Sequence, residues 1–479
     1  MNWLLFWAIA YVLILAVLTL RHVKTGDIED YLVNRRKTGT LLLVFTTLAT
    51  FVGGGTSMGL IAMGYESGFA AVGIGVAYVI GFMILAFYAG KIHHEGVKHS
   101  LYSFPQYLNR KYLTGNNPHF DRSFTAVVTG VNIFIFFFLL AAQFVGMASI
   151  LKFVLSIDYA TAAVISCLIV IAYTAFAGLS GVIITDALQF ILILFMVAFI
   201  FIPGINHDTE GLRLLDKLPA EMLNGTYYGI AFLVALPLFI APSVLVRMDI
   251  WQRVLAAKSD KTARSMALWS GAGMLPFYII FPLVGMAIRL KFGATEAPED
   301  VAWLFLSRHC GEFALGFAII GIMSALMSSG DSFLNVISIS SIRDFSGWTK
   351  KHKTSQNKQY IYIRVASIIF GLLALALALL LPEIVNLMVV GIGTIAIFVP
   401  ITFLALTKGN VMRYRKAALI SVISGFICNL VFFILGMKHA GFFEPKSSFI
   451  PAFIISLVTL VAGVLIVDHT RPELNKRKN

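Results

Sequence analysis

The sequence predicts an all-α integral membrane protein made of one domain. Of its 479 residues, 58% are hydrophobic and only 13% are charged, which is about half the charged share of a soluble protein. The length alone would allow about three soluble domains, but no polar interval is long enough to separate independent cores. We therefore treat residues 1–479 as a single membrane domain, which excludes an ordinary soluble enzyme.

Apolar runs long enough to cross about 30 Å of hydrocarbon predict thirteen transmembrane helices. Their expected ranges are 3–20, 40–64, 68–89, 123–154, 159–177, 181–203, 227–246, 266–288, 312–341, 361–381, 383–406, 417–437 and 449–467. The first run lacks a basic start and an A-x-A-type cleavage site, so we expect a retained helix rather than a signal peptide.

The charges are distributed unequally between the predicted loops. The chain has 37 Lys and Arg against 24 Asp and Glu, a net charge of +13. If the N-terminus lies outside, most of the basic residues fall in cytoplasmic loops, as the positive-inside rule requires. We therefore expect a multi-pass protein of the cell (plasma or inner) membrane, with the N-terminus outside and the C-terminus in the cytoplasm. The positive charge then describes topology and does not indicate nucleic-acid binding.

Two predicted spans contain residues that interrupt a helix. Residues 49–57 include three consecutive glycines, and residues 236–243, five spans later, include two prolines. Each glycine costs about 1 kcal/mol in a helix, and each proline removes a backbone donor. Breaks at matching places in two five-helix halves are typical of inverted-repeat transporters, whose binding sites lie at the breaks. Close helix packing at the glycines and an ordinary kink at the prolines are the alternatives.

The ninth span carries a stripe of side-chain oxygens. Ser328, Ser332 and Asn335 recur at helical spacing, with Ala325 and Ser329 close by. Hydroxyl groups beside unwound backbone carbonyls suit small hard cations. Serines alone more often bond back to the preceding helical turn, so the stripe by itself leaves both interpretations open.

Two acids, Asp186 and Asp331, lie within apolar segments. A carboxylate in the bilayer costs at least ~2.5 kcal/mol on insertion scales, so a pairing ion, proton or charged residue is expected. Asp186 lies near a predicted helix start, where helix capping is an alternative. At the cytoplasmic end of the proline-containing span, residues 249–253 predict an interfacial salt bridge with an aromatic anchor, with gating as the second interpretation.

These features resemble the solute:sodium symporter family, which includes sodium/proline, sodium/galactose, sodium/pantothenate and sodium/sialic acid transporters. The resemblance runs from about residue 1 to the last span. It rests on four stretches: residues 30–36, the glycine break with residues 64–68 after it, residues 177–189 ending in Thr-Asp-x-x-Gln, and residues 325–329 with the pattern Ala-x-x-Ser-Ser.

The resemblance implies a LeuT-type fold of two inverted five-helix repeats. The first repeat is expected at 40–203 and the second at 227–406, with an extra helix and loop at 1–39 and two helices with a cytoplasmic tail at 407–479. It also implies a sodium-coupled secondary active symporter that imports a small polar organic solute by alternating access.

The resemblance further implies which residues bind the ligands. The positions that match the family's shared sodium site are Ala49, Val52, Ala325, Ser328 and Ser329. Some members have a second cation site, and its positions match Asp186, Ser328, Asp331 and Ser332, with Asp at 331 where those members have Ser. The matching substrate positions are Gly53, Thr56 and Ser57, although Gly53 stands where some members have Ser.

No phosphate-binding or nucleophile pattern is found in the sequence. We therefore expect no catalysis, no metal or cofactor other than the co-transported sodium ion, and as partners only the solute, Na⁺ and lipid, with no nucleic acid and no obligate protein partner. Asp331 motivates a proton-coupled transporter on the same fold as the alternative, and a sensor or channel is a further one. The sequence does not distinguish a sugar, amino acid, carboxylate, vitamin or urea as solute, nor one sodium ion from two.

Overall fold

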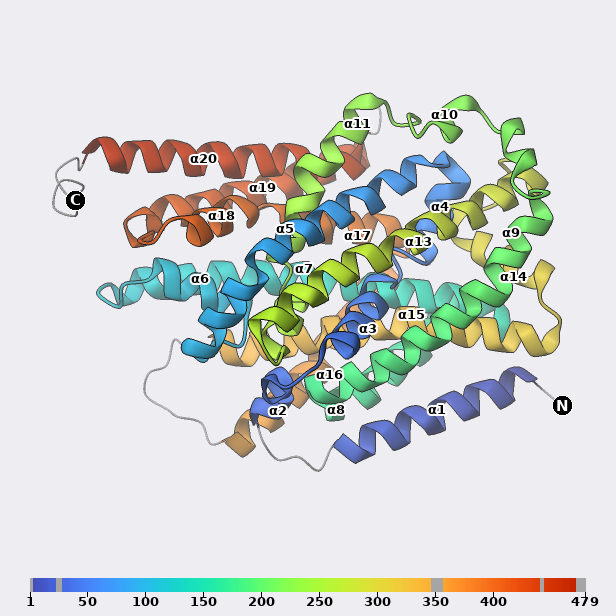
Figure 1. Cartoon of the computed structure of the whole chain (residues 1–479), viewed down its shortest axis with the longest axis horizontal. Helices are drawn as coiled ribbons and strands as arrows, with labels where there is room; N and C mark the ends of the chain where they lie inside the picture. The colour runs from blue at the N-terminus through green and yellow to red at the C-terminus, as the bar shows by residue number, and fades with distance from the viewer. Residues whose placement is uncertain (1–2, 23–27, 346–355, 440–442, 471–479) are drawn as a thin grey trace.

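The computed structural model describes residues 3–22, 28–345, 356–439 and 443–470. Apart from one isolated bridge between Thr38 and Ala257, the regular structure of these residues is helical, and most helices follow the long axis of the molecule (Figure 1). The long helices are α1 (Trp3–His22), α5 (Ala70–Lys98), α7 (Pro118–Val154), α8 (Tyr159–Met196), α13 (Asp260–Phe292), α15 (Glu312–Ile339), α16 (Gln356–Leu380), α19 (Arg415–Lys438) and α20 (Phe449–Thr470).

Shorter helices connect or extend the long ones. They are α2 (Ile28–Val33), α3 (Thr40–Phe51), α4 (Met58–Ser67), α6 (Phe104–Tyr112), α9 (Ile202–Asp208), α10 (Ala220–Leu223), α11 (Ile230–Ala235), α12 (Met248–Ala256), α14 (Val301–His309), α17 (Ile384–Ala396) and α18 (Val399–Thr407). The predicted run 40–64 is thus divided into α3 and α4, and the run 383–406 is divided into α17 and α18.

In the described part of the chain, nine helices are long and apolar enough to cross a membrane. The pair Ile230–Val246 and Met248–Ala256, bent by 50°, would make a tenth span, and three shorter apolar helices overlap the predicted spans 3–20, 40–64 and 159–177. The predicted all-α membrane fold is therefore confirmed, whereas the number thirteen stays a prediction.

The predicted spans 159–177 and 181–203 meet at Gly178. Its backbone has φ 58° and ψ −174°, a conformation that glycine adopts without steric cost. A Cβ at this position would also lie 2.3 Å from Cδ2 of Tyr31. Asp186 lies about two helical turns beyond this kink and inside α8. The alternative that Asp186 caps a helix start is therefore wrong.

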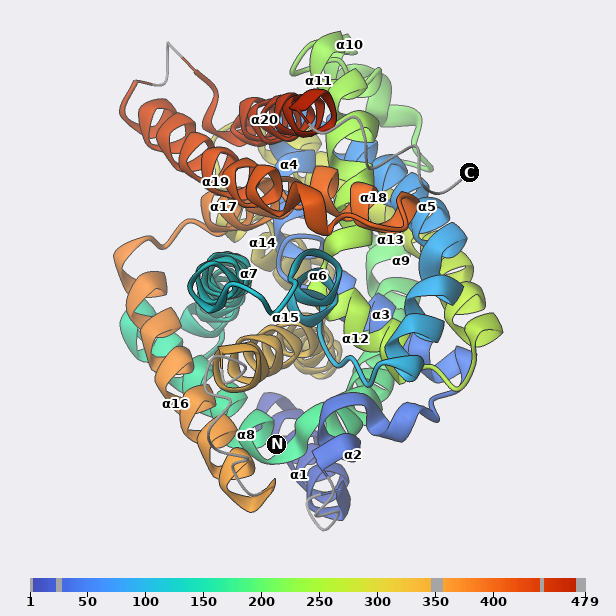
Figure 2. The same cartoon turned by 90° about the vertical axis from the view of Figure 1, so that its left-hand side faces the viewer.

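Helices α7 and α15 occupy the middle of the molecule when it is seen along its long axis (Figure 2). Nearly every residue of α15 from Ala318 onward is buried, and this helix packs against α1, α3, α7, α8 and α16. The oxygen-bearing stripe of the ninth span therefore lies in the protein interior, beside α3, and not against lipid.

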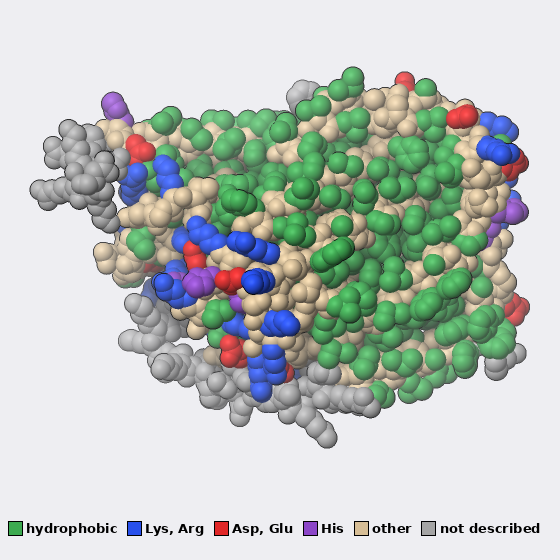
Figure 3. Space-filling view, in the orientation of Figure 1, with side chains coloured by type: hydrophobic (Ala, Val, Ile, Leu, Met, Phe, Trp, Pro, Cys, Tyr) green, Lys and Arg blue, Asp and Glu red, His purple; other side chains and the backbone are tan. Residues whose placement is uncertain are grey.

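The surface carries a broad apolar area bounded by charged ends (Figure 3). Large hydrophobic side chains are exposed there, among them Phe87 at 74% and Phe199 at 70%. Lys and Arg side chains gather at the left-hand end of this view. Apolar exposure on this scale requires lipid as the solvent, so the structure is that of a multi-pass membrane protein.

Candidate functional site

The chain between α3 and α4 is not helical and is held by specific hydrogen bonds. The backbone N–H of Gly54 donates to Oε1 of Gln143 at 2.6 Å, so it does not bond to the Thr50 carbonyl as it would in a continuous helix. The Ser57 hydroxyl donates to the Gly53 carbonyl at 3.0 Å. Within the described residues, no donor reaches the carbonyl oxygen of buried Val52. The break therefore leaves carbonyl oxygens that need other partners.

Helix α15 supplies those partners through two adjacent serines. The Ser328 hydroxyl lies 2.8 Å from the Ala49 carbonyl oxygen and 3.0 Å from that of Ala325. The Ser329 hydroxyl lies 2.6 Å from the Thr50 carbonyl oxygen and 3.4 Å from that of Ala325. Each hydroxyl has one hydrogen and can donate to only one of its two carbonyls. The structure thus brings together several oxygen acceptors with few hydrogens to satisfy them.

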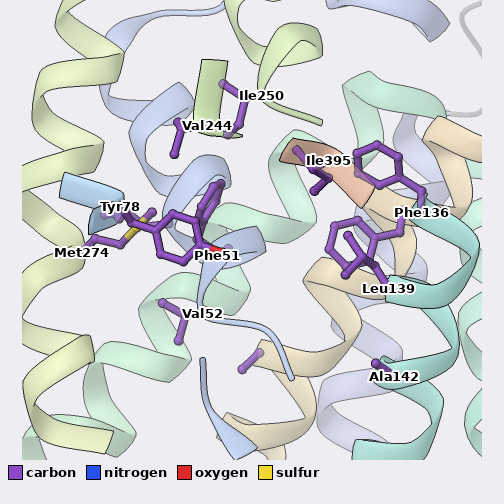
Figure 4. Close-up of a cluster of buried hydrophobic side chains, with 14 of the residues drawn as sticks. Phe51, Val52, Tyr78, Phe136, Leu139, Ala142, Val244, Ile250, Met274 and Ile395 are labelled. Carbon is purple, nitrogen blue, oxygen red and sulfur yellow. The ribbon is translucent and has the colours of Figure 1, made fainter. Parts of the chain in front are cut away.

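Four of the five residues that match the family's sodium site contribute oxygens to this cluster, namely Ala49, Ala325, Ser328 and Ser329. Val52, the fifth, lies at the end of α3, where Figure 4 shows it next to Phe51. The cluster is neutral, buried and rich in oxygen, which are the properties that a small hard cation requires of its ligands.

The guanidinium of Arg253 lies among the oxygens predicted to hold a second cation. Its Nη2 donates to Asp186 Oδ2 at 3.2 Å and to Ser332 Oγ at 2.7 Å. The same nitrogen lies 2.8 Å from the Thr50 hydroxyl and 3.2 Å from that of Thr46, which itself donates to Asp186. The side chain of Arg253 is 1% exposed and that of Asp186 is 0% exposed. An internal cation therefore already neutralises this carboxylate.

The aromatic anchor predicted within residues 249–253 is wrong, because Trp251 is buried in the protein, whereas the depth of this segment in the membrane stays a prediction. Asp249, Trp251 and Arg253 are all buried, because the chain bends by 50° between Val246 and Met248 and directs α12 into the protein. Asp249 accepts two hydrogen bonds from Arg247, at 3.0 and 2.6 Å. The guanidinium of Arg247 in turn lies 4.1 Å from the centre of the Phe51 ring, beside the first break.

Asp331 has different partners from Asp186. Its Oδ2 lies 3.1 Å from the Tyr173 hydroxyl, which also lies 3.0 Å from the Met327 carbonyl oxygen. Its Oδ1 is buried and has no hydrogen-bond partner among the described residues. The four residues predicted for the second cation site therefore do not converge on one point. Asp186 and Ser332 both contact Arg253, whereas Ser328 contacts Ala49 and Asp331 contacts Tyr173.

A cavity of about 110 Å³ adjoins the first break. Its polar lining comes from the glycines of the break and from Thr50, Thr56, Gln143, Arg247 and Ser329, and the remaining lining is apolar or aromatic. Of the predicted substrate residues, Gly53 and Thr56 line the cavity, whereas Ser57 points its hydroxyl at the backbone. A second, mostly apolar cavity of about 390 Å³ adjoins the first and shares Met63, Ile74 and Tyr78 of its lining.

Several residues of this cavity were not singled out from the sequence. Tyr278 in α13 accepts a hydrogen bond from the Thr56 hydroxyl at 3.0 Å, and Tyr78 in α5 packs against Phe51 with ring centres 5.5 Å apart. Gln143 is the exception, because an amide within a long apolar run is expected to form a helix–helix hydrogen bond rather than to bind a ligand. It accepts from the Gly54 N–H and also lines the cavity. The tyrosines give no such signal, because aromatic residues are frequent throughout the chain.

Comparisons with known proteins identify a family for this chain. Residues 31–425 match the model of the sodium:solute symporter family. A sodium/proline symporter of Staphylococcus aureus is 25% identical over 498 residues, covering 97% of this chain and 93% of that protein. Twenty-five per cent identity over nearly the whole of both proteins indicates a shared architecture and leaves the solute open.

Solved structures show the same fold. A Na⁺-coupled sialic acid symporter in a substrate-bound outward-open state aligns with a TM-score of 0.77 at 18% identity, covering 97% of this chain and 98% of that one. Mhp1, a nucleobase-cation-symport-1 family transporter with bromovinylhydantoin bound, aligns with a TM-score of 0.56 at 14% identity, covering 92% and 95%. These likenesses confirm the predicted LeuT-type fold. With a family match over most of its length, the chain belongs to the sodium:solute symporter family and is a sodium-coupled solute symporter.

Proposed function

We propose that the coupling sodium ion binds where α15 meets the first break, at Ala49, Val52, Ala325, Ser328 and Ser329. The observation that carries this proposal is the convergence of the two serine hydroxyls on carbonyl oxygens that lack helical partners. Unwound backbone in a membrane must find partners, and a bound sodium ion would satisfy these oxygens without adding a charged side chain.

The position of Ser329 explains how sodium and solute are coupled. Its hydroxyl contacts the Thr50 carbonyl and the same residue lines the 110 Å³ cavity. Sodium that orders Ser329 and the break therefore also orders the solute pocket. By linkage, each ligand then raises the affinity for the other by the same factor. Inward movement of the ion gains about 2.3 kcal/mol per charge per 100 mV of membrane potential.

The cavity favours a small organic solute with a polar group and an apolar portion. Gln143, Thr56 and Arg247 offer hydrogen-bonding groups on one part of the wall, while Met63, Ile74 and other apolar residues form the rest. Pockets of this kind orient a ligand through a few polar contacts and bury its apolar surface. The solute enters the cell with sodium by alternating access, in which the helix bundle rocks against its scaffold around the binding site.

A single sodium ion per solute is the stoichiometry that the charges favour. Arg253 supplies a positive charge among the oxygens of the second candidate site, so a second sodium ion there would meet repulsion. Asp331, which forms no ion pair among the described residues, keeps proton coupling as the second candidate function.

The charged ends of the molecule support the predicted orientation. The end rich in Lys and Arg in Figure 3 faces the cytoplasm under the positive-inside rule. The N-terminus, at the opposite end in Figure 1, then lies outside. The predicted cytoplasmic tail beyond residue 470 lies outside the described residues.

Uptake into vesicles tests the proposed function. The solute is first identified by a thermal-shift screen of the purified protein against sugars, amino acids, carboxylates, vitamins and urea, each with and without Na⁺. Uptake of the stabilising solute is then measured under an imposed sodium gradient and, separately, under a proton gradient. We expect the sodium gradient to drive uptake, and uptake driven by protons alone would refute the sodium site.

A further inference from the structure

The ends of α9 and α14 hold a cluster of two histidines around a buried carboxylate. Asp208, the last residue of α9, is 0% exposed. Its Oδ2 lies 2.7 Å from Nε2 of His309, the last residue of α14, and its Oδ1 lies 3.2 Å from Nδ1 of His207. One ligand atom from each of the three residues lies within 4.8 Å of the other two.

We propose that His207, Asp208 and His309 form a binding site for a zinc ion. Zinc prefers imidazole nitrogen and carboxylate oxygen at about 2.0–2.2 Å, in tetrahedral geometry. Ligand atoms of a tetrahedral site with such bonds lie about 3.3 Å apart. His309 Nε2 lies 2.7 Å from Oδ2 of Asp208, and His207 Nδ1 lies 3.2 Å from the other oxygen, Oδ1. Since one ligand atom from each residue lies within 4.8 Å of the other two, a turn of the exposed His207 ring would bring the three to this spacing.

The three residues differ in mobility in a way that suits metal capture. His309 is held in place, because its side chain is 11% exposed and its ring packs on Phe305 with centres 4.6 Å apart. His207 is 72% exposed, so its ring can turn toward an ion without disturbing the core. Asp208 and His309 provide two ligands in fixed positions, and the exposed His207 provides the third. Water would be the fourth ligand, as in open zinc sites.

Arg308 supports the carboxylate through Oδ1, the oxygen that also faces His207. Its Nε lies 3.2 Å from Oδ1 of Asp208, which leaves Oδ2 available as the zinc ligand. A hydrogen-bonded carboxylate is the usual outer-shell arrangement around a metal ligand. Because the arginine compensates the charge of Asp208 in the absence of metal, the chain can fold with or without the ion.

A bound zinc ion would cross-link α9 and α14, which are far apart in the sequence. Asp208 and His309 come from α9 and α14, which pack closely where a Cβ on Gly204 would lie 2.5 Å from the Phe305 ring. In the proposed orientation this end of the molecule is the outer one, at the right of Figure 1 where α9 and α14 are labelled. External zinc would thus stabilise the closed packing of α9 against α14.

Zinc titration of the purified full-length protein in detergent tests the proposal. Isothermal calorimetry and thermal shift are recorded with ZnCl₂, with MgCl₂ as the comparison ion, for wild type, His207→Ala and His309→Ala. His119→Ala is the matched control, because His119 is an exposed histidine at the start of α7, outside the cluster. None of these measurements requires solute or transport, so failure here is distinct from failure of the sodium site.

The expected result is one saturable zinc ion per chain in wild type and in His119→Ala, with no comparable response to magnesium. Each cluster variant should bind zinc at least about tenfold more weakly. Absence of saturable zinc binding in wild type would overturn the proposal, as would unchanged affinity in either cluster variant. Since His207 is exposed, His207→Ala alone decides the matter if His309→Ala does not fold.

Discussion

Two clusters of oxygen atoms lie side by side along α15, and they differ in charge. The first, around Ser328 and Ser329, contains only hydroxyl and carbonyl oxygens from α15 and the end of α3. The second, around Ser332, adds the carboxylate of Asp186 and the guanidinium of Arg253. They are one helical turn apart and share Thr50, whose carbonyl belongs to the first and whose hydroxyl to the second.

The difference shows what makes an oxygen cluster available to a free cation. In the first cluster, the carbonyl oxygens outnumber the hydroxyl hydrogens that can bond to them, and no charged side chain is present. A free cation can therefore bind to these oxygens. In the second, the Asp186 carboxylate is already paired with the resident cation of Arg253, while Asp186 Oδ1 and Arg253 Nε are buried without a hydrogen-bond partner among the described residues. A serine stripe therefore marks a candidate cation site only where no internal charge already occupies it.

Arg253→Gln gives the largest expected effect, since it breaks the second cluster. It leaves the Asp186 charge buried without its cation, and we expect the unfolding free energy to fall by about 3–5 kcal/mol. Thermal denaturation in detergent measures this loss. The double variant Asp186→Asn with Arg253→Gln should recover most of it, and a double variant as unstable as the single one would contradict the pairing.

Gly53→Ala perturbs the first cluster. A Cβ on Gly53 would lie 1.8 Å from Ser329 Oγ and 3.0 Å from Gln143 Oε1, so Ser329 must leave the Thr50 carbonyl. We expect a stability loss of about 1–3 kcal/mol together with weakened sodium binding. Gly59→Ala is the matched control, because its nearest neighbour would lie at an ordinary 3.5 Å. Equal sodium affinity in the two variants would argue against Ser329 as a ligand.

Thr46→Val gives the smallest effect and separates the two clusters. It removes a hydroxyl that bonds to Asp186 and Arg253 but leaves Ser328 and Ser329 untouched. We expect a stability loss of about 1 kcal/mol and a sodium affinity within about twofold of wild type, measured by binding of radioactive Na⁺. A larger change in sodium affinity would mean that the second cluster also takes part in sodium binding.

The sequence predicted the elements that depend on hydropathy and on helix-breaking residues. The apolar runs locate the helices, and the glycines of residues 49–57 locate the non-helical turn at 52–57. The two prolines mark distorted turns over residues 236–246, but the bend itself comes at Arg247. Hydropathy does not report where α12 turns, and this is why its tryptophan was expected as an aromatic anchor.

The residues of the candidate site could be predicted only where they form a recognisable pattern within a single segment. Ser328 and Ser329 stand out on one helix, and their partners Ala49 and Ala325 follow from the family resemblance. The position of Arg253 depends on the packing of four segments that are distant in sequence. No local pattern encodes that packing, so the second cluster required the structure.

Binding of radioactive Na⁺ to the purified protein tests the central claim most directly, and it needs no solute. Wild type should bind one sodium ion per chain, and the double variant Ser328→Ala with Ser329→Ala should lose this binding. Ser338→Ala is the control, because this buried serine of the same helix bonds to Leu334 and Ser367, away from both clusters. Sodium binding that survives in the double variant, or two ions bound per wild-type chain, would contradict the account.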